Sequence, residues 1–206
     1  MSDSNPGISL NPDNMVAVAE LRKLAEQGNA EAQFRLGSMY GNGDEVPLDH
    51  GKALEYFMSA AKQGHENAVI TLAWMYATGT GVETSDEKAR DLYLMAANHG
   101  SVKGQYMAAS MYRFGQHGVQ RDIAKALDYY QRAANGGSAQ AQMALGRMLI
   151  EGKHVEKDNV VALQWLFLAQ ANGAKRADEV IKEVLKTMPP EDVEKARAVM
   201  TSGKPE

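Results

Sequence analysis

Residues 29–64 read NAEAQFRLGSMYGNGDEVPLDHGKALEYFMSAAKQG, and the chain then rewrites this stretch three times. The rewritten copies are residues 65–100, 101–137 and 138–173, with one inserted residue in the third unit. Each unit closes on a glycine, at Gly64, Gly100, Gly137 and Gly173. A period of this length is typical of stacked repeats, in which each unit buries its apolar surface against its neighbours.

The first half of every unit carries small and apolar residues at helical spacing. Aligned on the closing glycines, the matching positions are Ala32, Ala68, Gly104 and Ala141; Leu36, Leu72, Ala108 and Leu145; Gly37, Ala73, Ala109 and Gly146; Tyr40, Tyr76, Tyr112 and Leu149. Steps of four, one and three residues place these positions on one face of a helix. The small residues let a second helix approach closely.

The second half of every unit follows a polar loop that contains glycine. A capping residue comes first, and alanine and aromatic or leucine positions follow it. The sets are Asp49, Ser85, Asp122 and Asp158; Ala53, Ala89, Ala126 and Ala162; Tyr56, Leu92, Tyr129 and Trp165; Phe57, Tyr93, Tyr130 and Leu166; Ala60, Ala96, Ala133 and Ala169. This pattern predicts a second helix with a buried aromatic face.

The two ends of the chain depart from the repeat. Residues 1–12 contain prolines and glycine and predict a disordered lead, and residues 13–28 predict half a repeat. In that helix Asp13 is the expected N-cap and Gly28 the expected terminator. Its expected buried face is Ala17, Leu21, Leu24 and Ala25. Residues 174–200 predict capping helices with apolar positions Ala177, Ile181, Leu185, Val193, Ala196 and Met200, and residues 201–206 a flexible tail.

Composition narrows the class of protein. The chain has 206 residues, 44% hydrophobic residues, no cysteine and a formal net charge of −4. It shows no basic cluster of the kind that binds nucleic acid, no long apolar run and no secretory signal pattern at its start. We therefore expect a cytoplasmic protein that binds no nucleic acid and does not insert into membranes.

Motifs for chemistry are weak. The glycine pairs Gly41/Gly43 and Gly79/Gly81 lack the strand and the Lys-Ser/Thr of a phosphate loop, so we expect turns there. The histidines fall at or near loops without metal-ligand spacing, and they are expected to be solvated: His50, His65, His99, His117 and His154. We expect no metal, no cofactor and no catalytic residues.

The combined pattern A-x-x-x-L-G-x-x-Y, a G-x-G-V loop, a polar cap and K-A-x-x-(Y/W)-(Y/F)-x-x-A-A-x-x-G resembles the Sel-one-like repeat family, a relative of the tetratricopeptide repeat. The resemblance covers nearly all of the repeated region. It implies an all-α fold, a superhelical α/α solenoid of helix-turn-helix repeats, with a curved, right-handed course. It also implies an adaptor in protein complexes, often bacterial, and a concave binding groove. A cysteine-rich secreted branch of the family is linked to penicillin binding or β-lactam hydrolysis.

Candidate binding residues are those where the units differ on the expected concave face. Trp74 stands in a column with Ser38, Ser110 and Arg147, whereas Trp165 takes a core position of the second helix. The expected binding set is Phe34, Arg35, Ser38, Ile70, Thr71, Trp74, Tyr106, Met107, Ser110, Arg113, Met143 and Arg147. Phe34 and Tyr106 equally suit packing between neighbouring helices, and any one arginine equally suits an internal ion pair.

We therefore expect a non-catalytic scaffold that binds a protein or peptide, with apolar anchors beside Trp74 and acidic groups at Arg113 and Arg147. Three alternatives stay open. The protein could serve one cognate protein, as an immunity protein or secretion chaperone does. It could be a hydrolase like the cysteine-rich branch. It could also self-assemble, although a monomer or weak homo-oligomer is expected.

Overall fold

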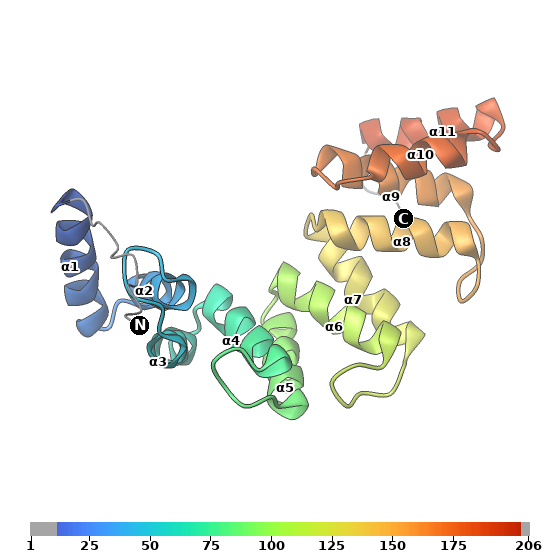
Figure 1. Ribbon diagram of the computed structural model, residues 1–206. Helices are drawn as coiled ribbons and strands as arrows, with labels where there is room; N and C mark the ends of the chain where they lie inside the picture. Colours follow the sequence, from blue (N-terminus) through green and yellow to red (C-terminus); the bar gives the residue numbers. More distant parts are fainter. Residues whose placement is uncertain (1–11, 203–206) are drawn as a thin grey trace, which may run out of the picture. The chain divides into compact units, whose positions relative to one another are not determined.

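The structure is a computed structural model that describes residues 12–202. Within that range it contains eleven α-helices and no strand, as an all-α repeat solenoid requires (Figure 1). The helices are α1 (Pro12–Glu26), α2 (Ala30–Asn42), α3 (His50–Lys62), α4 (Glu66–Thr78), α5 (Asp86–Asn98), α6 (Val102–Phe114), α7 (Ile123–Asn135), α8 (Ala139–Glu151), α9 (Asn159–Ala171), α10 (Ala177–Leu185) and α11 (Pro190–Ser202). The predicted fold class is confirmed.

The chain forms two compact units, which are described separately. The first unit ends at Tyr93 and the second begins at Leu94, so the boundary falls inside α5. In the first unit α2 packs against α1 and α3, and α3 packs against α4. In the second unit α6 pairs with α7 and α8 with α9, and α9 also contacts α10 and α11.

Predictions for the two ends need correction. Residues 1–11 of the expected lead and residues 203–206 of the expected tail lie outside the described residues. Pro12 is already the first residue of α1, where a missing N–H is tolerated, so Asp13 lies inside the helix and is not its N-cap. At the other end α11 continues through Ser202, beyond the predicted start of the tail.

Helix ends follow the chemistry that the sequence predicts. The expected caps of the second helices accept backbone N–H bonds, for example Asp49 from Lys52 at 2.9 Å and Asp122 from Lys125 at 3.0 Å. Gly64 and its counterparts all have left-handed backbones, with φ between 80° and 91°. Glycine suits these positions because it has no Cβ to clash, so each hairpin closes on the same turn.

The repeated small and apolar positions form the core. Leu36, Ala53 and Ala60 are 0% exposed in the first unit, and Trp165 and Leu166 are 2% and 0% exposed in the second. Some tyrosines of the predicted second-helix face are only partly buried. Tyr56 stacks on Tyr40 and Tyr129 on Tyr112, with ring centroids 5.8 and 5.9 Å apart.

In α1 the predicted buried face is partly wrong. Ala17 is exposed and Leu24 is 41% exposed, whereas Val18, which the pattern did not select, is 6% exposed. The corresponding positions of α3, Ala53 and Ala60, are covered because α3 pairs with α2 as well as α4. In contrast, α1 packs chiefly against α2.

Two buried glutamines connect consecutive hairpins. Gln33 donates from Nε2 to the carbonyl of Ala25 at 3.1 Å and accepts from Gln63 at 2.7 Å. Gln142 donates in the same way to the carbonyl of Ala134 at 2.9 Å. A buried amide without a partner is costly, so these bonds satisfy the glutamine and the helix-end carbonyl together.

Glycine-to-alanine substitution is expected to have opposite effects at two helical positions. A Cβ on Gly104 would lie 2.7 Å from both the Cβ of Ala96 and the backbone nitrogen of Ala97, whereas one on Gly41 would meet nothing closer than 3.6 Å. Gly104→Ala should lower the free energy of unfolding by about 1–3 kcal/mol, because backbone must move. Gly41→Ala should raise it by up to about 1 kcal/mol through helix propensity. Urea unfolding of both variants checks this, and equal shifts would contradict the packing.

Candidate functional site

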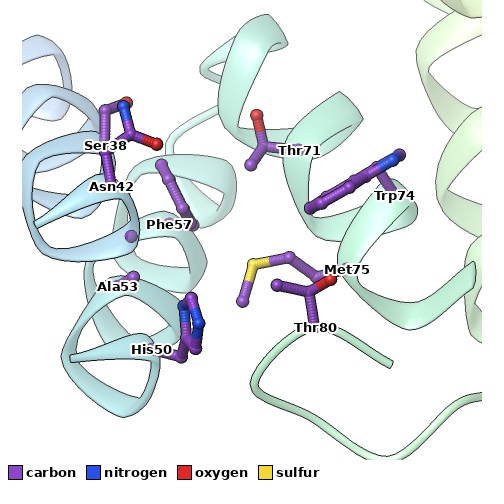
Figure 2. Close-up of a pocket in the computed structure, with 10 residues that line it drawn as sticks. Ser38, Asn42, His50, Ala53, Phe57, Thr71, Trp74, Met75 and Thr80 are labelled. Atoms are coloured by element: carbon purple, nitrogen blue, oxygen red, sulfur yellow. The ribbon is translucent and has the colours of Figure 1, made fainter. Parts of the chain in front are cut away.

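A pocket of about 250 Å³ opens on the first unit between α2, α3, α4 and the loop after α4 (Figure 2). Ten residues line it: Ser38, Gly41, Asn42, His50, Ala53, Phe57, Thr71, Trp74, Met75 and Thr80. Its lining brings together three residues of the predicted binding set, Ser38, Thr71 and Trp74. The first two project from α2 and α4 near the pocket, and the Trp74 ring stands at its edge.

The pocket has an apolar floor and a polar rim. Ala53, Phe57 and Met75 are at most 4% exposed, so they form the floor. Trp74 is 49% exposed, which is unusual for an indole on a helix whose neighbours Ala73 and Met75 are buried. A half-exposed indole beside a dry floor is the arrangement that binding hot spots share.

Polar groups of the rim are held by their own helices. The hydroxyl of Ser38 donates to the carbonyl of Phe34 at 3.1 Å, and that of Thr71 donates to the carbonyl of Asn67 at 2.7 Å. Each hydroxyl oxygen keeps lone pairs that can accept from a ligand. His50 is the one residue with a titratable side chain among the ten that line the pocket, and no Lys, Arg, Asp or Glu joins it.

The other predicted residues of the first unit do not line this pocket. Ile70 is 3% exposed, so it lies in the core and does not present the open surface expected of a binding residue. Arg35 forms an ion pair with Glu31 at 2.7 Å. Phe34 packs between two rings, with centroid distances of 5.7 Å to Phe57 and 4.6 Å to His65, so it fills space within the array.

The Glu31 carboxylate contacts two cations or potential cations. Oε1 accepts from Nε of Arg35, and Oε2 lies 3.1 Å from Nε2 of His65. The hydrogen bond with His65 and then that with Arg35 lower the pKa of Glu31. His65 is therefore an ordered junction residue with a side chain 14% exposed, and its expected solvation is wrong.

Three of the predicted residues in the second unit lie in two separate places. Tyr106 and Met143 line a separate cavity of about 590 Å³ beside the start of α8. Arg113 lies over the ring of Phe114, with its guanidinium carbon 5.1 Å from the ring centroid, and Phe114 is 60% exposed. Burial raises the pKa of the Tyr130 hydroxyl, and a hydrogen bond from Arg113 acts in the opposite direction.

The remaining predicted residues of this unit differ in exposure. Met107 and Ser110 are half-buried on α6, and Arg147 is exposed on α8. Among residues 12–202, Arg147 has no ion-pair partner, which distinguishes it from Arg35. Neither Arg113 nor Arg147 lines the pocket beside Trp74 or the cavity beside the start of α8, and their pairing as a site for acidic groups stays a prediction.

Several pocket residues could not be found by comparing repeats. His50 is the first residue of α3, whereas Thr80 lies in the loop after α4, in the next repeat, and both line the pocket. A Cβ on Gly81, whose φ is 70°, would lie 2.3 Å from the Cβ of His50. Only glycine lets this loop approach so closely, and the sequence signal for it is the second glycine of Gly79-Thr80-Gly81.

Across residues 12–202, no group of three or more His, Cys, Asp or Glu side chains is placed to hold a metal ion. Over the same range, every helix is too short or too polar to cross a lipid bilayer.

Comparison with known proteins identifies the repeat. A model of the Sel1 repeat matches residues 30–65, 68–101, 102–138 and 139–173. No curated protein matches the chain. Among solved structures, c5321, described as a protective antigen present in uropathogenic Escherichia coli strains displaying an SLR fold, is 28% identical with a TM-score of 0.75. The match covers 88% of this chain but only 39% of the antigen.

Two further structures have the same architecture. A Sel1 repeat protein from Oxalobacter formigenes is 26% identical over 87% of this chain and 80% of its own, with a TM-score of 0.75. The immunity protein Pa5087 from Pseudomonas aeruginosa is 21% identical over 96% of this chain and 75% of its own, with a TM-score of 0.59, a likeness of fold. Since the Sel1 model matches most of the sequence, the chain belongs to the Sel1 repeat family.

Proposed function

We propose that this protein is a non-catalytic adaptor and that the pocket beside Trp74 receives a side chain of a partner protein or peptide. Sel1 repeat proteins generally mediate protein–protein interactions. The observation that carries the proposal is the half-exposed indole of Trp74 beside the buried floor formed by Phe57 and Met75. Aromatic anchors in this setting dominate the binding energy of many interfaces.

The size and chemistry of the pocket select the kind of ligand. At about 250 Å³ it is smaller than the roughly 300–1,000 Å³ typical of sites for whole drug-sized molecules, so it suits one side chain. Its lining includes no Lys, Arg, Asp or Glu, so a charged side chain would lose hydration without gaining an oppositely charged partner. We infer that the partner inserts one uncharged apolar side chain, and that its neighbouring backbone bonds with Ser38, Asn42 or Thr71.

Charged contacts belong to the second unit in this proposal. Arg147 is exposed without an ion-pair partner in the described chain, and Arg113 lies against the exposed ring of Phe114. An arginine backed by an aromatic ring suits a carboxylate of the partner, because its planar fork offers two parallel donors.

Catalysis is not part of the proposal. Among the residues that line the pocket, the imidazole of His50 is the one group suited to proton transfer, and no second titratable side chain orients it there. The immunity protein from Pseudomonas aeruginosa suggests service to a single cognate protein, yet its 21% identity supports only the shared fold. The adaptor role therefore remains the broader and preferred proposal.

Photo-crosslinking tests the position of the site. Peptides are first selected from a random library on the wild-type protein, and a photoreactive benzoylphenylalanine is then placed at Thr71, which lines the pocket. The matched control carries the same group at Glu55, an exposed residue of α3 that does not line the pocket. Crosslinking at Thr71 but not at Glu55 is the expected result. Equal crosslinking at both positions, or failure to select any peptide, would contradict the proposal.

A further inference from the structure

One histidine caps the N-terminus of a helix, a role that asparagine and serine fill at the equivalent positions of the other repeats. The first helices of the four repeats begin after Asn29, His65, Ser101 and Ser138, and each of these side chains accepts the backbone N–H three residues later. The bond to Nδ1 of His65 comes from Ala68 and measures 3.2 Å. Among these four caps only the imidazole changes its charge between about pH 5 and 8.

The surroundings of His65 determine which ring nitrogen carries the hydrogen. Nδ1 accepts from Ala68, so the hydrogen of the neutral ring must be on Nε2. Nε2 lies 3.1 Å from the Glu31 carboxylate and can donate to it. The ring is also stacked on Phe34, with an interplanar angle of 23°. The neutral ring with its hydrogen on Nε2 therefore satisfies every contact that the structure gives it.

We propose that His65 is a pH-sensitive cap for α4. Protonation of Nδ1 turns the acceptor into a donor that faces the N–H of Ala68, so the capping bond is lost. The new positive charge also lies at the N-terminus of α4, where the helix dipole is unfavourable for cations. A proton on His65 thus loosens the start of the helix that follows repeat 1.

The carboxylate of Glu31 acts against this effect. Glu31 attracts the imidazolium, but its side chain is 56% exposed and Arg35 already pairs with it at 2.7 Å. The exposed Glu31–Arg35 pair is screened by water and shares the carboxylate with His65, which limits the attraction to the imidazolium. Glu66 in the first turn of α4 is the other acidic group beside the cap. The lost capping bond and the cation at the helix start both destabilise the folded chain, so stability is lost as pH falls.

The same helix carries Thr71, Trp74 and Met75 of the pocket. Loosening α4 would weaken ligand binding at acidic pH, a consequence that rests on the proposed function. The cap itself does not depend on that function, because its evidence is the geometry of His65. Its test therefore uses stability and spectroscopy of the free protein.

The variants His65→Asn and His65→Ser copy the caps that the chain uses at Asn29 and Ser101. Urea unfolding of the first unit is compared for wild type and both variants between about pH 8 and pH 5. The wild-type midpoint should fall more steeply on acidification than either variant's. Because the variants retain the other histidines, the difference reports on His65 alone.

A midpoint that falls in parallel in all three proteins would overturn the proposal. A wild type that gains stability over His65→Asn in acid would overturn it too, because the attraction to Glu31 would then prevail over the lost cap. Glu31→Gln sharpens the comparison, since it removes that attraction and should steepen the acid loss. Nitrogen NMR of the ring gives a direct readout. It should show Nδ1 unprotonated and Nε2 protonated at about pH 8, and the reverse tautomer would contradict the cap.

Discussion

Replacing Trp165 by alanine is expected to lower the free energy of unfolding of the second unit by about 3–5 kcal/mol, the range measured for buried aromatic residues. The indole is 2% exposed and belongs to the core cluster that also contains Ala126, Tyr130 and Leu145. Truncation leaves a cavity between the hairpins α6–α7 and α8–α9 that rigid neighbouring helices cannot close. Urea unfolding followed by far-UV circular dichroism measures the loss.

The control for this prediction is the other tryptophan. Trp74→Ala removes the same side chain from a site that is 49% exposed, so the free energy of unfolding should change by no more than about 1 kcal/mol. Trp165→Phe should be intermediate, because a smaller ring refills part of the cavity. If Trp165→Ala unfolds no more easily than Trp74→Ala, the assignment of Trp165 to the core is wrong.

The second large effect concerns binding. Trp74→Ala should weaken the affinity for selected peptides by about 30-fold or more, which corresponds to a loss of at least about 2 kcal/mol for a hot-spot aromatic residue. The reason is that the indole forms one side of the pocket over the buried Phe57 and Met75. Isothermal titration calorimetry of wild type and variant with one peptide provides the measurement.

Met58→Ala is the matched control, because it removes an exposed apolar side chain at a position outside the pocket. Met58 is 39% exposed but does not line the pocket, so its removal should leave the affinity nearly unchanged. The unfolding midpoint of Trp74→Ala must stay close to wild type for the comparison to report on contact rather than folding. An unchanged affinity in a folded Trp74→Ala protein would place the binding surface elsewhere.

Much of the fold can be predicted from the sequence because its determinants are local. Asp49, Asp122 and Gly64 act on the turn of helix beside them, and the same chemistry recurs in each repeat. Repetition also separates the residues needed for packing from those free to vary. Trp165 occupies a position of the first kind and Trp74 a position of the second. Their exposures of 2% and 49% confirm that distinction.

The site is less predictable, because the burial of each side chain depends on the side chains packed around it. Alignment of repeats gives the direction in which Ile70 points, but the bulk of adjacent side chains decides its 3% exposure. A repeat pattern also does not predict the path that a loop takes. His50 and Thr80 line one pocket because Gly81 lets the loop after α4 come close to α3. A Cβ at Gly81 would lie only 2.3 Å from the Cβ of His50. Likewise, a cap position can be identified in sequence, while the contact between His65 and Glu31 needs the structure.

The fluorescence of Trp74 tests the central claim most directly. The chain has two tryptophans, so Trp165→Phe leaves Trp74 as the single indole, and its emission reports on the pocket alone. Titration with a selected peptide should shift this emission to shorter wavelength and saturate at the affinity found by calorimetry, because the ligand side chain excludes water from the ring. A peptide that binds by calorimetry while the emission of Trp74 stays unchanged would contradict the assignment of the pocket as the binding site.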